Sequence, residues 1–395
     1  MKFTRDEVMQ YVEETDVKFI RLAFCDVYGK QKNVAIMPGE LKRAFDYGIA
    51  IDASSIAGFG GEVRSDLLLH PDPATLTALP WRPQSGRVVH MFCDITYPDG
   101  KPFEADTRRI LKTAVAEAEQ AGYSFSVGSE IEFYLFRLDE NGHPTAEPYD
   151  HAGYMDIVPE DKGENVRREI CLTLEQMGIQ PESSHHESGP GQNEIDFRYA
   201  DPLTAADHAV MFQSVVRTIA AQNGLWADFS PKPLPDQPGS GMHINLSAQD
   251  QSGMDCMPGI IAGLIDKTRE ITLFLNPGDS SYQRLGRDRA PGSVSWSPEN
   301  RSQLIRVPAA DGQFRRIELR SPDPSANPYL AFALVILATL EGLCHNMTPP
   351  PPAESGLESV PLLPSSLHMA KEEAARSEFL RTHLPESVLE AYLCR

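Results

Sequence analysis

Four short segments of the chain alternate charged or amide side chains with isoleucine. They cover residues 128–133, 191–197, 239–245 and 315–320. Successive side chains of a β-strand point to opposite faces of its sheet, so each segment is predicted to be a strand whose isoleucine faces a core. The opposite face would then carry Glu130, Glu132, Gln192, Glu194, Asp196, His243, Asn245, Arg316, Glu318 and Arg320. A face this polar covers a core poorly and is well suited to bind divalent cations and phosphate groups.

Longer segments between these strands space their apolar residues as an amphipathic helix does. The first helix is predicted over residues 107–120, with Asp106 or Thr107 as its N-cap and Gly122 at its end. Strands that alternate with helices predict an α+β fold, in which an antiparallel or mixed sheet is backed by helices. The other helices are predicted over 165–177, 205–223, 260–275 and 329–344.

The first hundred residues predict a smaller, β-rich unit. Residues 17–36 indicate two strands around a turn at Tyr28 and Gly29, and residues 87–97 indicate a further strand. Turn-forming residues then cluster at 98–102, which is the expected domain boundary. We therefore expect a first domain over residues 1–100 and a second over residues 101–395.

Composition and charge exclude several classes of function. The 395-residue chain has a formal net charge of −20, which argues against nucleic acid or a membrane surface as its partner. Its six cysteines lack C-x-x-C spacing, as is typical of reduced thiols. The N-terminus has no apolar signal region, and the most apolar run, Tyr329–Leu340, is shorter than the roughly 20 residues that span a membrane. We expect a cytoplasmic protein.

The acidic residues can be sorted into two candidate metal sites. Glu187 and Glu194 bracket a glycine-containing turn and, with Glu132, would form a site of three carboxylates. A second site would add an imidazole, from Glu130, His243 and Glu318. Mg²⁺ and Mn²⁺ prefer oxygen ligands and tolerate one nitrogen. Two such ions close together would bridge phosphate groups in a displacement reaction.

Arginines are concentrated in the same polar part of the chain. Their planar guanidinium groups suit carboxylate and phosphate, and phosphoryl transfer needs positive charge on the migrating group. Surface salt bridges are the simpler interpretation for Arg287 and Arg315. No Walker A motif and no GxGxxG sequence after a strand is present, so a nucleotide would be bound in another way. The remaining arginines are Arg284, Arg289, Arg301, Arg306, Arg316 and Arg320.

The chain resembles the glutamine synthetase family, most closely its bacterial type I branch, from about residue 17 to about residue 341. The resemblance lies in VKFIRLAFCDVYGKQKNV, IDASSIAGF, SDLLLHPD, GSEIEFYLF, SHHESGPGQNEIDF, GSGMHINLS, SYQRL, NRSQLIRVP and RRIELRSPDPSANPYLAFA. It implies a small N-terminal β-grasp-like domain and a catalytic domain whose curved, mainly antiparallel sheet is backed by helices. It also implies ring-shaped homo-oligomers with active sites between subunits.

The resemblance further implies an ATP-dependent ligase with two Mg²⁺ or Mn²⁺ ions per site. Such an enzyme makes γ-glutamyl phosphate from glutamate, and ammonia or an amine then displaces the phosphate. Asp52 would bind ammonium at the neighbouring subunit's site, and Tyr154 and Gly239 would line the pocket for the amine and the amino acid. Arg284, Arg301 and Arg320 would hold glutamate and phosphate. The nucleotide would be held by Arg306, Arg316 and Ser247, and the two metals by the glutamates and histidine sorted above.

Three positions depart from the family's pattern. Arg289 stands where a glutamate usually closes the site and helps to deprotonate ammonium, Pro238 replaces an asparagine that contacts glutamate, and Gln313 replaces a lysine. A cation at residue 289 would repel ammonium. The leading interpretation is therefore a γ-glutamyl amide synthetase for an organic amine.

Two alternatives remain open at this point. Synthesis of glutamine from ammonia stays possible because Asp288 could act in place of the missing glutamate. A different class of protein, a non-catalytic relative that binds nucleotide or assembles into rings, is the other alternative. The complete set of metal ligands argues against it.

Overall fold

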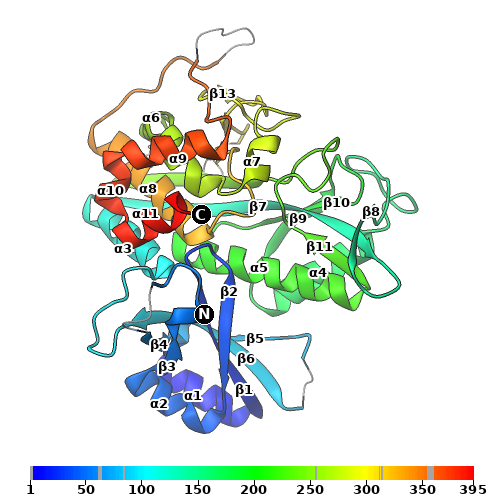
Figure 1. The fold of residues 1–395 in the computed structure, drawn as a ribbon, viewed down its shortest axis with the longest axis vertical. Coiled ribbons are helices and arrows are strands. Elements are labelled where there is room, and N and C mark those ends of the chain that lie inside the picture. Colours follow the sequence, from blue (N-terminus) through cyan, green and yellow to red (C-terminus); the bar gives the residue numbers. More distant parts are fainter. Residues whose placement is uncertain are drawn as a thin grey trace.

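Two β-sheets organise the chain (Figure 1). The computed structural model describes residues 3–60, 65–82, 85–253, 256–310, 312, 315–353 and 360–395. A six-stranded sheet near the N-terminus, here the N-terminal sheet, is followed by a nine-stranded sheet, here the C-terminal sheet. Helices accompany both sheets. The α+β fold expected from the sequence is confirmed.

The N-terminal sheet has the strand order β2-β1-β6-β4-β3, with β5 paired to β6. Strands β1 and β6 run parallel, and the other pairs are antiparallel. The predicted hairpin is formed by β1 and β2, and the strand predicted over 87–97 is β6. The elements of this unit are α1 (Arg5–Glu14), β1 (Val17–Cys25), β2 (Gln31–Ile36), η1 (Pro38–Glu40), α2 (Leu41–Tyr47), β3 (Ile49–Asp52), η2 (Ala53–Ser55), β4 (Asp66–Pro71), η4 (Pro73–Thr75), β5 (Thr77–Ala78) and β6 (Arg87–Thr96).

The tip of the β1–β2 hairpin contacts the C-terminal part of the chain. Gly29 has a φ of 82°, and a Cβ atom there would lie 2.8 Å from the Cα of Asn327. The side-chain amide of Asn327 also donates a hydrogen bond of 3.0 Å to the carbonyl of Val27. Only glycine satisfies both the left-handed backbone and this close approach.

The C-terminal sheet has the strand order β13-β14-β15-β12-β7-β10-β9, with β8 and β11 also paired to β7. It is mainly antiparallel, since only β13 and β14 pair in parallel among the pairings described. Its strands are β7 (Tyr123–Leu138), β8 (Pro144–Pro148), β9 (Pro181–His186), β10 (Gln192–Phe197), β11 (Leu225–Asp228), β12 (Met242–Asp250), β13 (Trp296–Pro298), β14 (Ile305–Val307) and β15 (Ile317–Leu319).

The register of this sheet brings the alternating polar residues together on one face. Glu132 lies opposite Glu194, and Glu130 lies opposite both Asp196 and His243. On the next strand, Asn245 lies opposite Glu318. The isoleucines of the four segments, Ile131, Ile195, Ile244 and Ile317, are fully buried on the other face, as predicted.

The last polar segment forms a shorter strand than expected. The strand predicted over 315–320 is reduced to β15, Ile317–Leu319. The amide of Arg320 donates its hydrogen bond to the carbonyl of Leu304, outside the ladder with β12. Arg316 and Arg320 therefore flank the strand.

Helices cover the apolar face of the C-terminal sheet. Helices α3 and α5 contact β7, and α6 contacts β12. The predicted N-cap Asp106 and the apolar helix after Asn327 are both present. The helices of this part are α3 (Thr107–Gln120), α4 (Glu164–Gln176), α5 (Pro202–Gln222), α6 (Met257–Leu275), α7 (Asp279–Arg284), α8 (Pro328–Cys344), α9 (Leu367–Arg376), α10 (Glu378–His383) and α11 (Glu386–Leu393).

The most apolar segment belongs to the core. Residues 329–339 lie in α8 and are all buried. In the described part of the chain, no helix combines the length and the apolar character that crossing a membrane requires. A core helix, as predicted, accounts for this segment.

An ion network joins the N-terminal sheet to helices that cover the C-terminal sheet. Arg108 of α3 is 3% exposed and donates from Nε and Nη2 to both carboxylate oxygens of Asp207 in α5, at 2.9 and 2.8 Å. Its Nη2 also donates to Asp72 at 2.9 Å, and its Nη1 to Asp94 at 3.3 Å. The phenol of Tyr329 donates to Asp207 at 2.7 Å. The network thus connects Asp72 and Asp94 of the first unit with helices α3, α5 and α8 of the second.

The N-cap of α3 is also buried. Asp106 is 3% exposed and accepts hydrogen bonds from the backbone amides of Ile95, at 2.9 Å, and Arg109, at 3.3 Å. Burial raises the pKa of Asp106 to about 6, and the nearby Asp94 carboxylate adds to the effect, although the Ile95 amide opposes it.

Replacing Asp106 with asparagine is expected to make stability less dependent on pH. A carboxyl whose pKa is raised in the folded state is stabilising below its unfolded pKa, and that stabilisation is lost as pH rises through its folded pKa. The shift corresponds to about 3 kcal/mol in all, of which roughly half falls between about pH 5 and about pH 8. Denaturant unfolding of the wild type and of Asp106→Asn over this pH range measures the free energy of unfolding of each protein. If the two free energies differ by the same amount at every pH, the raised pKa of Asp106 is contradicted.

Candidate active site

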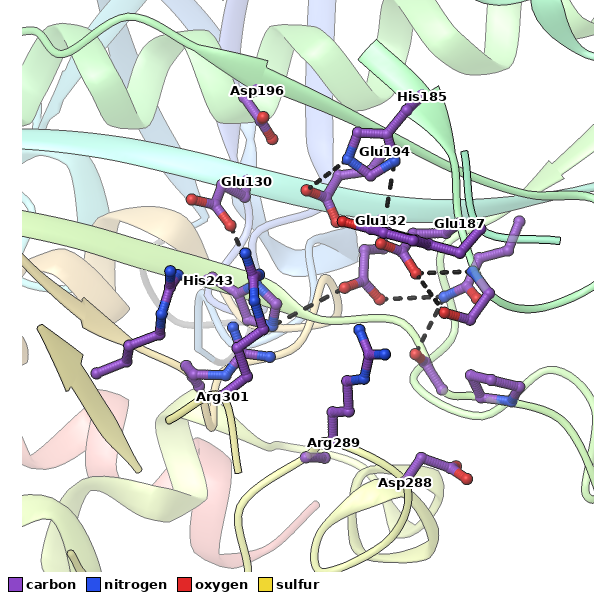
Figure 2. Close-up of a pocket in the computed structure, with 18 of the residues that line it drawn as sticks. Glu130, Glu132, His185, Glu187, Glu194, Asp196, His243, Asp288, Arg289 and Arg301 are labelled. Atoms are coloured by element: carbon purple, nitrogen blue, oxygen red, sulfur yellow. Dashed lines mark hydrogen bonds and ion pairs between the residues drawn. The ribbon is translucent and has the colours of Figure 1, made fainter. Parts of the chain in front are cut away.

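A cavity of about 920 Å³ lies on the polar face of the C-terminal sheet. Its floor is formed by β7, β9, β10 and β12, and residues within 287–290 and 301–309 contribute to its wall (Figure 2). Glu130, Glu132, Glu194 and Asp196 come from strands of the sheet, whereas the arginines come from later segments. Of the residues singled out from the sequence, the cavity is lined by Glu130, Glu132, Tyr154, Glu187, Glu194, Gly239, His243, Arg284, Asp288, Arg301, Arg306, Arg316 and Arg320.

The first cluster is the predicted site with one imidazole. His243 is 4% exposed, and its Nδ1 lies 3.3 Å from Glu130 Oε2 and 3.5 Å from Glu318 Oε1. Ligand atoms of these three residues all lie within 4.8 Å of one another. Burial disfavours the Glu130 carboxylate, but hydrogen bonds from His243 and Asn245 outweigh it and lower the pKa of Glu130 to about 2.

Two arginines neutralise the buried member of this cluster. Glu318 is fully buried and accepts a hydrogen bond of 2.7 Å from Arg306 and a short one from Arg320. Arg306 lies directly opposite Glu318 on β14. A buried carboxylate needs such partners. The predicted phosphate-binding arginines therefore lie next to the predicted metal ligands.

The second cluster contains a residue that the sequence interpretation missed. His185, Glu187 and Glu194 have ligand atoms within 4.8 Å of one another, and His185 Nε2 lies 3.5 Å from Glu194 Oε1. Glu132 lies directly opposite Glu194 in the sheet and faces the same cavity (Figure 2). Its Oε2 accepts hydrogen bonds from the Gly241 amide, at 2.9 Å, and from the Gln192 side chain, at 3.1 Å.

The signal for His185 was present in the sequence. Ser183, His185 and Glu187 alternate as the residues of the other polar strands do, and β9 places His185 directly opposite Glu194. The adjacent His186 points the other way and is fully buried. Its Nε2 lies 2.8 Å from Asp150, and its Nδ1 lies 2.6 Å from the carbonyl of Glu187. That contact supports the backbone of the cluster.

Crowding of carboxylates is the main electrostatic feature of this floor. Burial, together with the charges of Glu132 and Asp196, raises the pKa of Glu194 well above its usual value. Burial and the Glu130 charge raise the pKa of Asp196 to about 6. Like charges this close disfavour one another, and a divalent cation would relieve the repulsion. The donor set therefore fits hard divalent cations.

The side of the cavity near Arg284 is closely packed. Arg284 is 3% exposed, and its guanidinium donates to the carbonyls of Ser321, at 2.8 Å, and Arg320, at 3.1 Å. A Cβ on Gly239 would lie 2.4 Å from the carbonyl oxygen of Pro231 and 2.8 Å from Arg284 Cγ. Any larger residue at position 239 would therefore clash with the Pro231 backbone and with the Arg284 side chain. Pro238 lines the cavity beside it, and its carbonyl accepts a hydrogen bond of 2.5 Å from Tyr134.

The loop after α7 presents two side chains differently. Asp288 has a φ of 53°, and its carboxylate lies 3.2 Å from the amine of Lys232. The Arg289 guanidinium lies 5.7 Å from the ring centre of Tyr154, and the rings of Tyr154 and His185 pack edge to face with their centres 5.4 Å apart. In Figure 2, Arg289 points toward the acidic residues and Asp288 points away from them.

Other residues named from the sequence lie elsewhere or have other partners. Asp52 ends β3 in the N-terminal sheet and, like Ser247 of β12, is outside the cavity lining. Arg316 donates to Asn245 at 2.8 Å within the site. Arg287, for which surface salt bridges were the simpler interpretation, is exposed and also lines the cavity. Gln313 lies outside the described residues.

The acidic clusters and the surrounding arginines define a site of the kind that binds divalent cations and phosphate groups. Models of two domain families match the chain: the β-grasp domain of glutamine synthetase over residues 16–98, and its catalytic domain over residues 104–395. The chain belongs to the glutamine synthetase family.

Individual relatives agree with this assignment. The glutamine synthetase of Methanosarcina mazei is 45% identical, covering 99% of this chain and 93% of the relative. That of Clostridium saccharobutylicum is 42% identical, covering 99% and 94%. A solved structure described as a GmaS/ADP complex superposes with a TM-score of 0.89 at 26% identity, covering 98% of this chain and 94% of that one. A GmaS structure without ligand gives 0.88 at 27% identity, covering 98% and 93%.

Proposed function

We propose that the protein is an ATP-dependent carboxylate–amine ligase, which converts glutamate or a similar acid to an acyl phosphate that ammonia or an organic amine then attacks. The observation that carries this proposal is the cavity itself, where two clusters of metal-binding side chains share a floor beneath several arginines. The named relatives and the GmaS structures support the same class of reaction.

The two clusters would hold two Mg²⁺ or Mn²⁺ ions. Glu130, His243 and Glu318 fit one ion, and Glu187 and Glu194 fit the other, with Glu132 facing the same space. When bound, such ions supply charge neutralisation on the phosphate groups of ATP. His185 is an alternative to Glu132 as the third ligand of the second ion, because its Nε2 faces Glu194.

The arginines would bind the anionic groups that meet above this floor. Arg306 and Arg316 are held by Glu318 and Asn245 respectively, which orients both side chains for phosphate. Arg320 and Arg301 would neutralise the transferred phosphate, and Arg284 the amino acid. Guanidinium groups fixed before the reaction stabilise developing charge without reorganising. Ser247 is the weakest of the nucleotide assignments, because it lies outside the cavity lining.

The amine would have to lose a proton before it attacks. Hydrogen bonds from the hydroxyl and amide of Ser54 lower the pKa of Asp52, so its carboxylate is ionised and able to bind a cation. We propose that Asp52 serves a neighbouring subunit in a ring-shaped homo-oligomer, which places active sites between subunits. We also propose a domain boundary near residue 100 and a cytoplasmic location. Asp288 is a less suitable base while Lys232 pairs with it.

An assay of phosphate release tests the proposal. Purified protein with ATP, glutamate and Mg²⁺ or Mn²⁺ is scanned against ammonia and a panel of amines, and the products are identified by mass. Release is expected to need ATP, metal, acid and amine together, because phosphate leaves only when the amine displaces it. Chelation of the metal is the control. Absence of release with every acid and amine, together with absence of metal-dependent ATP binding in calorimetry, would favour a non-catalytic relative.

A further inference from the structure

The loop between α7 and β13 places the positively charged side chain of Arg289 in front of the acidic floor of the cavity. The loop is closed by hydrogen bonds from the Gly286 amide to the Pro291 carbonyl, at 3.2 Å, and from the Ala290 amide to the Arg287 carbonyl, at 2.9 Å. Lys232 pairs with Asp288 on one side of the loop. Arg289, the next residue, extends into the cavity from the other side (Figure 2).

Arg289 differs in its partners from Arg284, Arg306 and Arg320. Arg306 and Arg320 both donate to Glu318, and Arg284 donates to backbone carbonyls. Among the contacts recorded for the described residues, Arg289 has the aromatic ring of Tyr154 and no carboxylate. A guanidinium over an aromatic face keeps its N–H donors available in the plane of the group.

The position of Arg289 relates it to the second cluster, that of His185, Glu187 and Glu194. Its guanidinium lies on Tyr154, Tyr154 lies against His185, and His185 faces Glu194 of the second cluster. An ammonium or alkylammonium ion entering along this wall would approach a fixed positive charge, which repels it. An amine that carries its own negative group would be attracted instead.

We propose that Arg289 selects an acceptor amine that carries a carboxylate, so that the preferred co-substrate is a small amino acid; this inference rests on the proposed ligase function. The planar guanidinium can receive a carboxylate through two parallel hydrogen bonds. A small amino acid held in this way by its carboxylate would present its nitrogen to the floor of the cavity. The product is then a γ-glutamyl amino acid.

The reaction balances without any further reagent. The ammonium group of the amino acid first loses one proton. Its nitrogen lone pair then forms the bond to the γ-carbonyl carbon of the acyl phosphate, while the carbon–oxygen bond to phosphate breaks and its electron pair leaves with inorganic phosphate. The second proton leaves the nitrogen as the amide forms. ATP, already required by the proposed function, supplies the phosphate.

Acceptors matched in size and different in charge test this inference. Glycine is compared with glycinamide, and β-alanine with propylamine, with ammonia and methylamine as references. We expect kcat/KM for each amino acid to exceed that of its uncharged partner at least about tenfold. Arg289→Glu is expected to reverse this order, through KM for the acceptor, and to leave KM for glutamate and ATP unchanged. Arg168→Glu makes the same charge change at an exposed position of α4, outside the cavity lining, and is expected to keep the wild-type order.

Each other outcome has a definite meaning. If ammonia or alkylamines are preferred and Arg289→Glu leaves the order unchanged, the inference is wrong while the ligase function stands. If Arg289→Glu instead raises KM for glutamate or ATP, Arg289 binds that substrate and the acceptor assignment is wrong. If no acid and amine pair supports metal-dependent phosphate release, the proposed function itself fails, and the inference with it.

Discussion

Replacing Glu318 with glutamine is expected to reduce turnover by about a thousandfold. The change removes one carboxylate of the cluster with Glu130 and His243 and leaves Arg306 and Arg320 facing a neutral amide in place of their shared anion. A bound metal ion contributes several kcal/mol of charge stabilisation, and losing about 4 kcal/mol of it corresponds to roughly that factor. Steady-state phosphate release measures the effect, and titration with Mn²⁺ is expected to show weaker metal dependence of ATP binding.

The experiment needs a control for folding, because Glu318 is fully buried. Glu147→Gln removes a carboxylate of the same size from an exposed pair with Arg137, 3.0 Å apart, and is expected to leave activity and metal binding as in the wild type. Thermal unfolding of both variants identifies the temperature at which each remains folded. A folded Glu318→Gln protein with wild-type metal dependence would show that Glu318 only anchors the two arginines.

Replacing Arg108 with methionine is expected to lower the free energy of unfolding by about 3–5 kcal/mol. The substitution leaves Asp207, which is 7% exposed, as a buried charge without its bidentate partner. Removing one member of a buried ion pair costs about this much, because the other charge stays buried and uncompensated. Denaturant unfolding, followed by two spectroscopic probes, measures the loss.

Two further variants test whether the loss of stability comes from the uncompensated charge of Asp207 or from the loss of any ion pair at this place. Lys112→Met removes a cation that also binds Asp94 but lies at a partly exposed position, and is expected to cost less than about 1 kcal/mol. Adding Asp207→Asn to Arg108→Met is expected to recover part of the loss, because no uncompensated carboxylate then remains. Equal losses for Arg108→Met and Lys112→Met would contradict the argument.

The metal-binding floor could be predicted because β-strands have a local rule. Glu130, Glu132, Glu194 and His243 were placed on one face by alternation alone, and the register of the sheet brings them together. The same rule applied to residues 183–187 would have found His185. The network of Arg108 could not be predicted in this way, since its partners come from β6, the segment before it and α5, and no local pattern relates them.

By itself the sequence determined which strands carry acidic residues and which family the chain resembles, because alternation and long motifs are properties of consecutive residues. The tertiary structure decided which side chains share a cluster and where each charge is directed. It paired Asp288 with Lys232 and left Arg289 facing the cavity. Those directions depend on how a turn closes and on what distant segments pack against it. For that reason the residues that would choose the amine could be named from the sequence, but their roles could be separated only in three dimensions.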